Sequence, residues 1–186
     1  MFSGAASAVD YRGFVEFNGG LLPVDEYDGY DSSSELYCHL YGSLSTTHGV
    51  QLNRHIFVGA GVDVNITGFR SEGDPQINVF GDVRYDVDIV KKWSPYVNMK
   101  VGYGVRKGTA ETSYGYYAES IKQLFINPSI GVRLRLSSKC GLNFGFGYVP
   151  ISMGKIYNYS GNIVDDSDTG RDKVKGAFTL NVGIDF

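Results

Sequence analysis

The chain has 186 residues, a formal net charge of −3 and charged side chains at 20% of its positions. It contains no apolar run near the ~20 residues that a transmembrane helix needs. Its mild acidity, with an isoelectric point near 5.6, argues against a nucleic-acid-binding surface. Aromatic residues make up 14% of the chain and glycine is abundant, at 25 residues, so the composition is not that of a disordered protein.

The first ten residues carry no strand pattern. Ala6-Ser7-Ala8 resembles the small-residue site at which signal peptidases cleave, with almost nothing before it. We expect residues 1–10 to be a flexible tail or the remnant of a secretory signal. Residues 11–186 are expected to form a single domain.

From residue 11 onward, apolar residues alternate with polar or small ones, which is typical of β-strands with two different faces. The last segment shows it most clearly, with Val182, Ile184 and Phe186 on one face and Asn181, Gly183 and Asp185 on the other. Eight segments carry the pattern, at residues 11–18, 36–48, 56–66, 77–89, 96–106, 124–136, 141–149 and 174–186. Residues 115–124 are expected to form one or two helical turns within a loop.

The connections between these segments alternate in length. Short ones lie near residues 50–55, 91–95 and 137–140, and longer ones near 19–35, 67–76, 107–121 and 154–173. Short links imply antiparallel neighbours, so the short turns share one end of the sheet and the long loops share the other. The pattern predicts an all-β, eight-stranded antiparallel up-and-down barrel over residues 11–186.

The polar face has the character of a narrow lumen. Glycine is common on it, and strands keep glycine where space is tight. Charges of both signs nearly balance there, and buried charges must be paired. We therefore predict a structural lumen network that plugs the barrel and consists of Arg12, Glu16, Asp63, Asp82, Arg84, Asp86, Asp88, Lys100, Arg106, Arg133, Arg135, Lys175 and Asp185.

Within this network we expect Arg106, Arg133 and Arg135 to face Asp63, Asp82 and Asp86. The apolar face then points outward, and most of its segments reach the ~9–11 residues that a tilted spanning strand requires. This predicts a transmembrane barrel. A soluble lipocalin-like barrel, with the apolar face inside, is the alternative.

Aromatic residues and prolines interrupt the simple alternation. Phe14, Phe57, Phe80 and Phe125 fall on the polar face, so they either pack in the lumen or mark a local slip of the pattern at a bulge. Trp93 and Tyr96, beside a short connection, predict an interfacial aromatic belt. Extension of the hairpin near 137–141 places Pro128 opposite Pro150, and we expect strand pairing to break or bulge there because proline cannot donate to a ladder.

The complete layout resembles the small eight-stranded outer-membrane β-barrels of Gram-negative bacteria, the group of the OmpA transmembrane domain and the OmpX-like porin-family proteins. The resemblance rests on Tyr11-Arg12-Gly13-Phe14-Val15, Ser45-Thr46-Thr47-His48-Gly49 and the terminal Leu180–Phe186. It implies a location in the bacterial cell outer membrane, with outer-membrane lipid as a partner. It also implies that Phe186 is a C-terminal insertion signal read by the outer-membrane assembly machinery.

The fold by itself implies no activity, and the sequence offers little catalytic chemistry. It holds no G-x-S-x-G or H-E-x-x-H motif, and Cys38 and Cys140 are expected to be free thiols. We predict no catalytic residue, cofactor, metal or nucleic acid, and a monomer with a structural or surface-interaction role. Its long loops are acidic and rich in tyrosine, and the sequence does not identify their external ligand. A narrow pore and a lipid-modifying enzyme that uses His39 are the alternatives.

Overall fold

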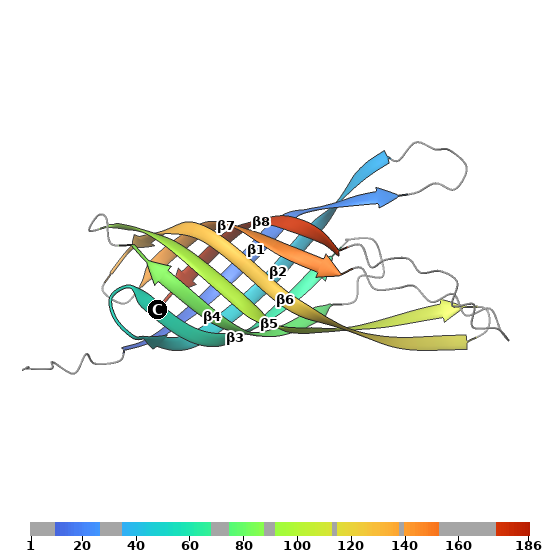
Figure 1. The fold of residues 1–186 in the computed structure, drawn as a ribbon, viewed down its shortest axis with the longest axis horizontal. Coiled ribbons are helices and arrows are strands. Elements are labelled where there is room, and N and C mark those ends of the chain that lie inside the picture. Colours follow the sequence, from blue (N-terminus) through green and yellow to red (C-terminus); the bar gives the residue numbers. More distant parts are fainter. Residues whose placement is uncertain are drawn as a thin grey trace, which may run out of the picture.

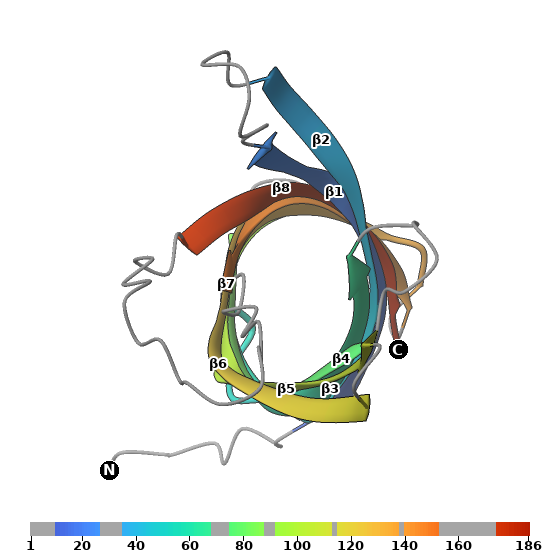
Figure 2. The same cartoon turned by 90° about the vertical axis from the view of Figure 1, so that its right-hand side faces the viewer.

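The computed structural model describes residues 10–26, 35–67, 75–87, 92–112, 115–137, 140–152 and 174–186. They form eight strands, namely β1 (Asp10–Glu26), β2 (Glu35–Gln51), β3 (Ile56–Thr67), β4 (Gln76–Asp86), β5 (Trp93–Thr112), β6 (Gly115–Arg135), β7 (Gly141–Ser152) and β8 (Val174–Asp185). Each strand pairs antiparallel with the next, and β1 pairs with β8 to close a barrel (Figures 1 and 2). The predicted eight-stranded antiparallel barrel is confirmed. No helix in these ranges has the length and hydropathy needed to span a membrane.

The barrel is polar inside and apolar outside. Along β4, buried and exposed residues alternate at every position, so Asp82 and Arg84 are 1% and 0% exposed while Val79 and Val83 are 59% and 53% exposed. Other strands follow the same rule, with Leu180 exposed on the outer wall and Lys100 buried in the interior. This polarity is the reverse of a soluble ligand-binding barrel and matches a barrel whose outer wall contacts lipid.

The four phenylalanines of the polar face pack in the lumen with no slip of the alternation. All of them are buried, and they form two pairs, Phe14 with Phe57 (ring centroids 4.9 Å apart) and Phe80 with Phe125 (5.6 Å). The second pair belongs to an apolar cluster that contains Leu22, Tyr41, Phe80, Phe125, Val149 and Ala177. Leu22 lies further along β1 than Glu16, and Phe80 precedes Arg84 on β4, so this cluster lies on the long-connection side of Glu16 and Arg84.

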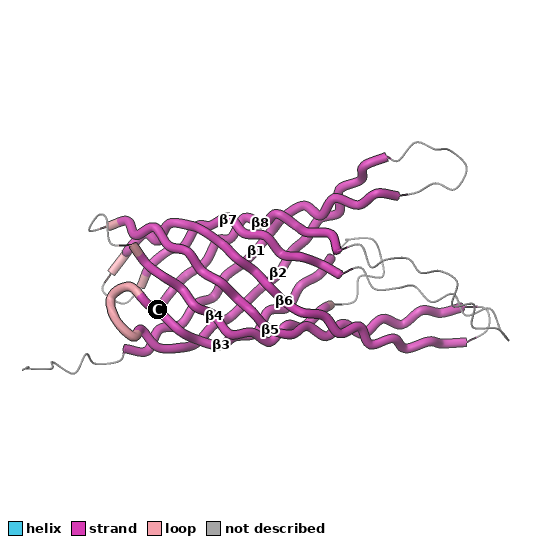
Figure 3. The backbone as a smooth tube through the Cα atoms, viewed as in Figure 1, coloured by secondary structure: helices cyan, strands magenta, loops and turns pink. Residues whose placement is uncertain are grey.

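Two hairpins are longer than the sequence pattern predicts. The strands β5 and β6 continue through the predicted loop at 107–121, and residues 115–124 are strand rather than helical turns. Similarly, β1 and β2 extend to Glu26 and Glu35. Polar hairpins can pair completely in water because threonine and tyrosine favour extended backbone, so the loss of alternation does not end the strand. Both hairpins project beyond the barrel, on opposite sides of it (Figures 2 and 3).

The ladder between β6 and β7 stops at a proline. It runs from Arg135↔Gly141 to Ser129↔Gly147 and ends one residue before Pro128, as predicted. The expectation that Pro128 faces Pro150 is wrong, because the observed register would place Pro128 opposite Tyr148. In the turn between β6 and β7, the Leu136 N–H donates to the Cys140 carbonyl at 3.0 Å. This short turn pairs Arg135 with Gly141 and so shifts the register of the two strands by two residues from the predicted one.

The aromatic belt at the short-turn end contains one of its two predicted members. Trp93 is 47% exposed on the outer wall, whereas Tyr96 is 2% exposed and points inward. The two residues lie an odd number of positions apart on β5, so they cannot share a face. The thiols of Cys38 and Cys140 are both free.

Candidate functional site

Charged side chains from several strands converge inside the barrel because they occupy alternate positions of those strands. In β1 these positions hold Arg12 and Glu16, and in β4 they hold Asp82, Arg84 and Asp86. All five residues are buried. The closed sheet therefore concentrates groups of both signs, far apart in sequence, in one poorly solvated interior.

Glu16 lies at the centre of this interior and bridges two cations. Its Oε1 is 2.6 Å from Arg84 Nη2, and its Oε2 is 2.5 Å from Lys100 Nζ. Asp82 lies on the same strand as Arg84, and its Oδ1 accepts a hydrogen bond from Asn98 at 3.1 Å. The central group thus balances two carboxylates against two cations, which offsets the cost of removing them from water.

Aromatic rings enclose Arg84 on two sides. Its guanidinium carbon lies 4.0 Å from the centroid of the Phe14 ring and 4.3 Å from that of Tyr96. Its Nη1 also donates to Asn143 Oδ1 at 3.2 Å. A planar guanidinium can stack on aromatic faces and bind a carboxylate at its edge, so this residue joins the ionic and aromatic parts of the lumen.

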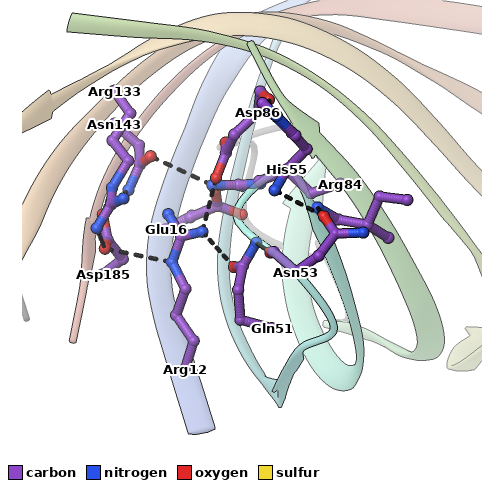
Figure 4. A network of polar contacts seen from close by, with 11 residues as sticks. Arg12, Glu16, Gln51, Asn53, His55, Arg84, Asp86, Arg133, Asn143 and Asp185 are labelled. Carbon is purple, nitrogen blue, oxygen red and sulfur yellow. Dashed lines mark hydrogen bonds and ion pairs between the residues drawn. The ribbon is translucent and has the colours of Figure 1, made fainter. Parts of the chain in front are cut away.

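A second group lies toward the short-turn end (Figure 4). Arg12 Nη1 is 2.7 Å from Asp86 Oδ2 and donates to Gln51 Oε1 at 2.8 Å. Its Nε is 3.4 Å from Asp185 Oδ2, and Asp185 is also paired with Arg133. Four strands, β1, β4, β6 and β8, therefore contribute to one network of two arginines and two aspartates.

Neutral amides surround Asp63, a further buried carboxylate of the lumen. Asp63 Oδ1 accepts a hydrogen bond from Asn78 Nδ2 at 2.8 Å, and Asn78 Oδ1 accepts one from Gln76 at 2.7 Å. The expectation that an arginine faces this carboxylate stays a prediction, because the side chain of Arg106 lies outside the described residues. Amide donors supply the hydrogen bonds that a buried carboxylate requires.

The outer wall has a hydroxyl–imidazole arrangement of its own. Thr46 Oγ1 lies 3.0 Å from His48 Nε2, and Tyr11 Oη lies 2.5 Å from His48 Nδ1. A triad that activates a hydroxyl needs an anionic group to orient the imidazole and stabilise its charged form. Tyr11 is a neutral phenol, so the arrangement is better suited to satisfying polar groups near the interface than to catalysis.

The whole barrel resembles solved structures, whereas two comparisons of the sequence found no match. No protein-family model matches the chain, and no curated protein matches it. Neisserial surface protein A matches with a TM-score of 0.59 at 12% identity, over 96% of this chain and 98% of that one. The outer membrane protein OprG of Pseudomonas aeruginosa matches with a TM-score of 0.54 at 12% identity, over 95% of each chain.

This chain has the fold of the small eight-stranded outer-membrane β-barrels. The likeness spans nearly the full length of both partners, so it includes the closed barrel and its strand order. At this level of identity the likeness concerns the fold alone. The function of this barrel must therefore be argued from its own interior and outer wall.

The structure describes the side chains of most of the predicted lumen residues. Inside the barrel, buried or half-buried, are Arg12, Glu16, Asp63, Asp82, Arg84, Asp86, Lys100, Arg133, Arg135 and Asp185. Asp88 and the side chains of Arg106 and Lys175 lie outside the described part of the structure, as does the side chain of His39. The pairing differs from the expected one, because Arg133 binds Asp185 and Asp82 contacts Asn98.

The sequence pattern did not identify the neutral members of the network. Asn98, Asn143 and Gln51 complete hydrogen bonds that the charges alone would leave open. Asn98 and Asn143 share the strand parity of the charged residues, and this shared parity was the available signal. Phe186 closes the barrel by exchanging backbone hydrogen bonds with Gly13, at 2.8 and 3.0 Å, and its ring faces outward.

Proposed function

We propose that this protein is a non-enzymatic barrel of the bacterial outer membrane, with a lumen plugged by side chains and a structural or surface-interaction role. The observation that carries the proposal is the inverted polarity of the barrel, apolar on its outer wall and ionic within. Only helices and closed barrels satisfy all backbone groups in lipid, and an outer wall with Leu180 66% and Leu124 61% exposed would aggregate in water.

The packed interior supports a plug rather than a channel. Glu16 and Arg84 are held by ionic contacts in the middle of the lumen, and the apolar cluster around Phe80 and Phe125 lies on the long-connection side of them. Barrels of eight strands leave an interior just wide enough for side chains. The lumen therefore serves to hold the barrel together.

The surface role rests on the two projecting hairpins. The strands β1 and β2, and likewise β5 and β6, stay paired well beyond the barrel rim (Figure 1). The β1–β2 hairpin is acidic and rich in tyrosine near its tip, as in Asp25-Glu26-Tyr27-Asp28, and the tip of the β5–β6 hairpin carries Tyr114, Tyr116 and Tyr117. Tyrosine offers rigid amphipathic contact area at binding surfaces. We propose that the barrel anchors these hairpins for contact with partners outside the cell.

The monomeric state and recognition of Phe186 by the assembly machinery are parts of the same proposal. The first is supported by the closure of the sheet, because β1 pairs with β8 and the barrel wall therefore has no edge strand. The second is supported by the position of Phe186, which directly follows β8, pairs with Gly13 through backbone hydrogen bonds and lies on the outer wall like Val182 and Ile184.

Reconstitution in lipid vesicles tests this proposal. We expect the unboiled protein to migrate differently from the boiled protein on a denaturing gel, as folded barrels do, and vesicles that contain it to retain a small sugar. Release of the sugar would support a pore instead. Changed lipid masses in the vesicles that are lost in His39→Ala would support an enzyme, and a stable, monodisperse protein without detergent would refute the membrane location.

A further inference from the structure

The outer wall has a hollow where β6 and β7 separate. A groove of about 540 Å³ crosses four strands there, and the outward side chains that line it include Val83, Met99, Ile130 and Tyr148. Its volume lies within the ~300–1,000 Å³ that is typical of small-molecule sites. The groove lies within the apolar outer wall, so it is continuous with the surface that faces lipid.

The break in pairing at Pro128 accounts for the position of the groove. The β6–β7 ladder ends at Ser129↔Gly147, although β6 extends to Gly115 and β7 to Ser152 within the described residues. Elsewhere β6 remains paired with β5, and β7 with β8, past this level. The strands β6 and β7 therefore separate only toward the long connections (Figure 1). The β5–β6 and β7–β8 ladders on either side of the gap stay paired.

A glycine on β8, Gly176, leaves room for the Tyr148 ring to lie beside the opening rather than over it. The Tyr148 ring lies over Gly176, where a Cβ atom would overlap its Oη and Cζ atoms. In this position the Tyr148 ring packs 5.2 Å from Phe178, on the flank away from β6. The groove thus stays open because the ring that borders it leans onto the neighbouring strand.

Ser129 and Asn98, which line the groove, make their side-chain hydrogen bonds within the barrel. Ser129 Oγ donates to Asn98 Oδ1, and Asn98 Nδ2 donates to Asp82 at 3.1 Å. Neither side chain needs a polar ligand. Apart from the hydroxyls of Tyr85 and Tyr148, the side chains that line the groove on its outer face are hydrocarbon or thioether. The groove therefore suits a hydrocarbon occupant, and the nearest source of hydrocarbon for this wall is the bilayer.

We propose that the groove between β6 and β7 is a binding site for one acyl chain of a membrane phospholipid. In a bilayer the surrounding tails are as apolar as the groove, so binding arises from close packing rather than from the hydrophobic effect. A chain that lies in the groove gains contacts on several sides, whereas one on the convex wall gains them on one side. This inference rests on the membrane location proposed above.

Mass spectrometry of the protein released intact from vesicles of phosphatidylethanolamine and phosphatidylglycerol tests the site. We expect the wild-type protein to retain one phospholipid. Met99→Trp fills the groove and should lower the retained fraction about fivefold, the effect of losing ~1 kcal/mol of binding free energy. The matched control is Val79→Trp, which adds the same bulk to an exposed outer-wall residue that does not line the groove.

Ile130→Trp, from another strand of the groove, repeats the test if Met99→Trp does not fold. Equal retention in the groove variant and in the control, or no retained lipid in the wild type, would overturn the inference. A dimer that the groove variant abolishes would assign the groove to a second copy and would also overturn it. Protein that shows no mobility difference on heating would instead indicate that the membrane location itself is wrong.

Discussion

At the scale of single residues, Glu16 is the carboxylate on which the central charge balance depends. It contacts both Arg84 and Lys100 and is 4% exposed. A buried ion pair contributes little compared with an apolar isostere, but removal of one partner leaves the other charge buried and uncompensated. Loss of Glu16 would leave Asp82 as the carboxylate balancing two cations in this central group.

We therefore expect Glu16→Gln to lower the free energy of unfolding by about 3–5 kcal/mol, measured by urea unfolding in lipid vesicles. Asp10→Asn removes an exposed carboxylate of the same strand and should leave the unfolding midpoint unchanged. Addition of Lys100→Met to Glu16→Gln restores the balance of charge and should recover part of the loss. A double variant less stable than Glu16→Gln would contradict this account.

At the scale of elements, neighbouring strands approach closely where lumen glycines face bulky side chains. Gly102 of β5 lies opposite Phe80 of β4. A Cβ atom added at Gly102 would lie 2.7 Å from the Phe80 Cβ and would overlap the Val79 carbonyl. Glycine at this position thus allows Phe80 to fill the lumen without pushing the strands apart.

Gly102→Ala should consequently lower the free energy of unfolding by roughly 1–3 kcal/mol, the usual cost of overpacking. Gly81→Ala is a close control, since Gly81 belongs to the next pair of the same ladder and its added Cβ would meet only ordinary contacts at 3.9 Å. We expect its effect to stay within ~0.5 kcal/mol. Similar losses in the two variants would show that lumen crowding is not the cause.

At the scale of the whole molecule, the outer wall sets the depth of the barrel in the membrane. Trp93 begins β5 beside a short turn, and its side chain is on the outer wall. Tryptophan prefers the interface between hydrocarbon and headgroups. Because Trp93 is the single tryptophan of the chain, its fluorescence reports this depth without any substitution.

We expect lipids brominated near the headgroup to quench Trp93 more strongly than lipids brominated near the end of the chain. Trp93→Phe should remove the signal and serves as the control for scattered light. Stronger quenching from the bilayer centre would place the short-turn end deep in the hydrocarbon. That result would be incompatible with the proposed orientation of the apolar wall.

The sequence by itself determined the strand count, the strand order and, for most residues of the alternating segments, the face that each occupies. Alternation is a local property with a period of two, so Asp82 and Val83 could be assigned to opposite faces without a structure. Antiparallel neighbours followed from the short connections. The end of the β6–β7 ladder at Pro128 could also be predicted, because proline lacks the N–H donor that a ladder needs.

The tertiary structure alone decided which of these residues meet. Partners such as Arg133 and Asp185 depend on the stagger of eight strands around a closed barrel, and a local pattern carries no information about stagger. The same holds for the hairpin register that separates Pro128 from Pro150, and for the length of the β5–β6 hairpin, where backbone pairing continues without an apolar face. The structure also explains why glycine and aromatic residues are abundant. Glycines such as Gly102 leave room for phenylalanines, which share the narrow lumen with the ion pairs.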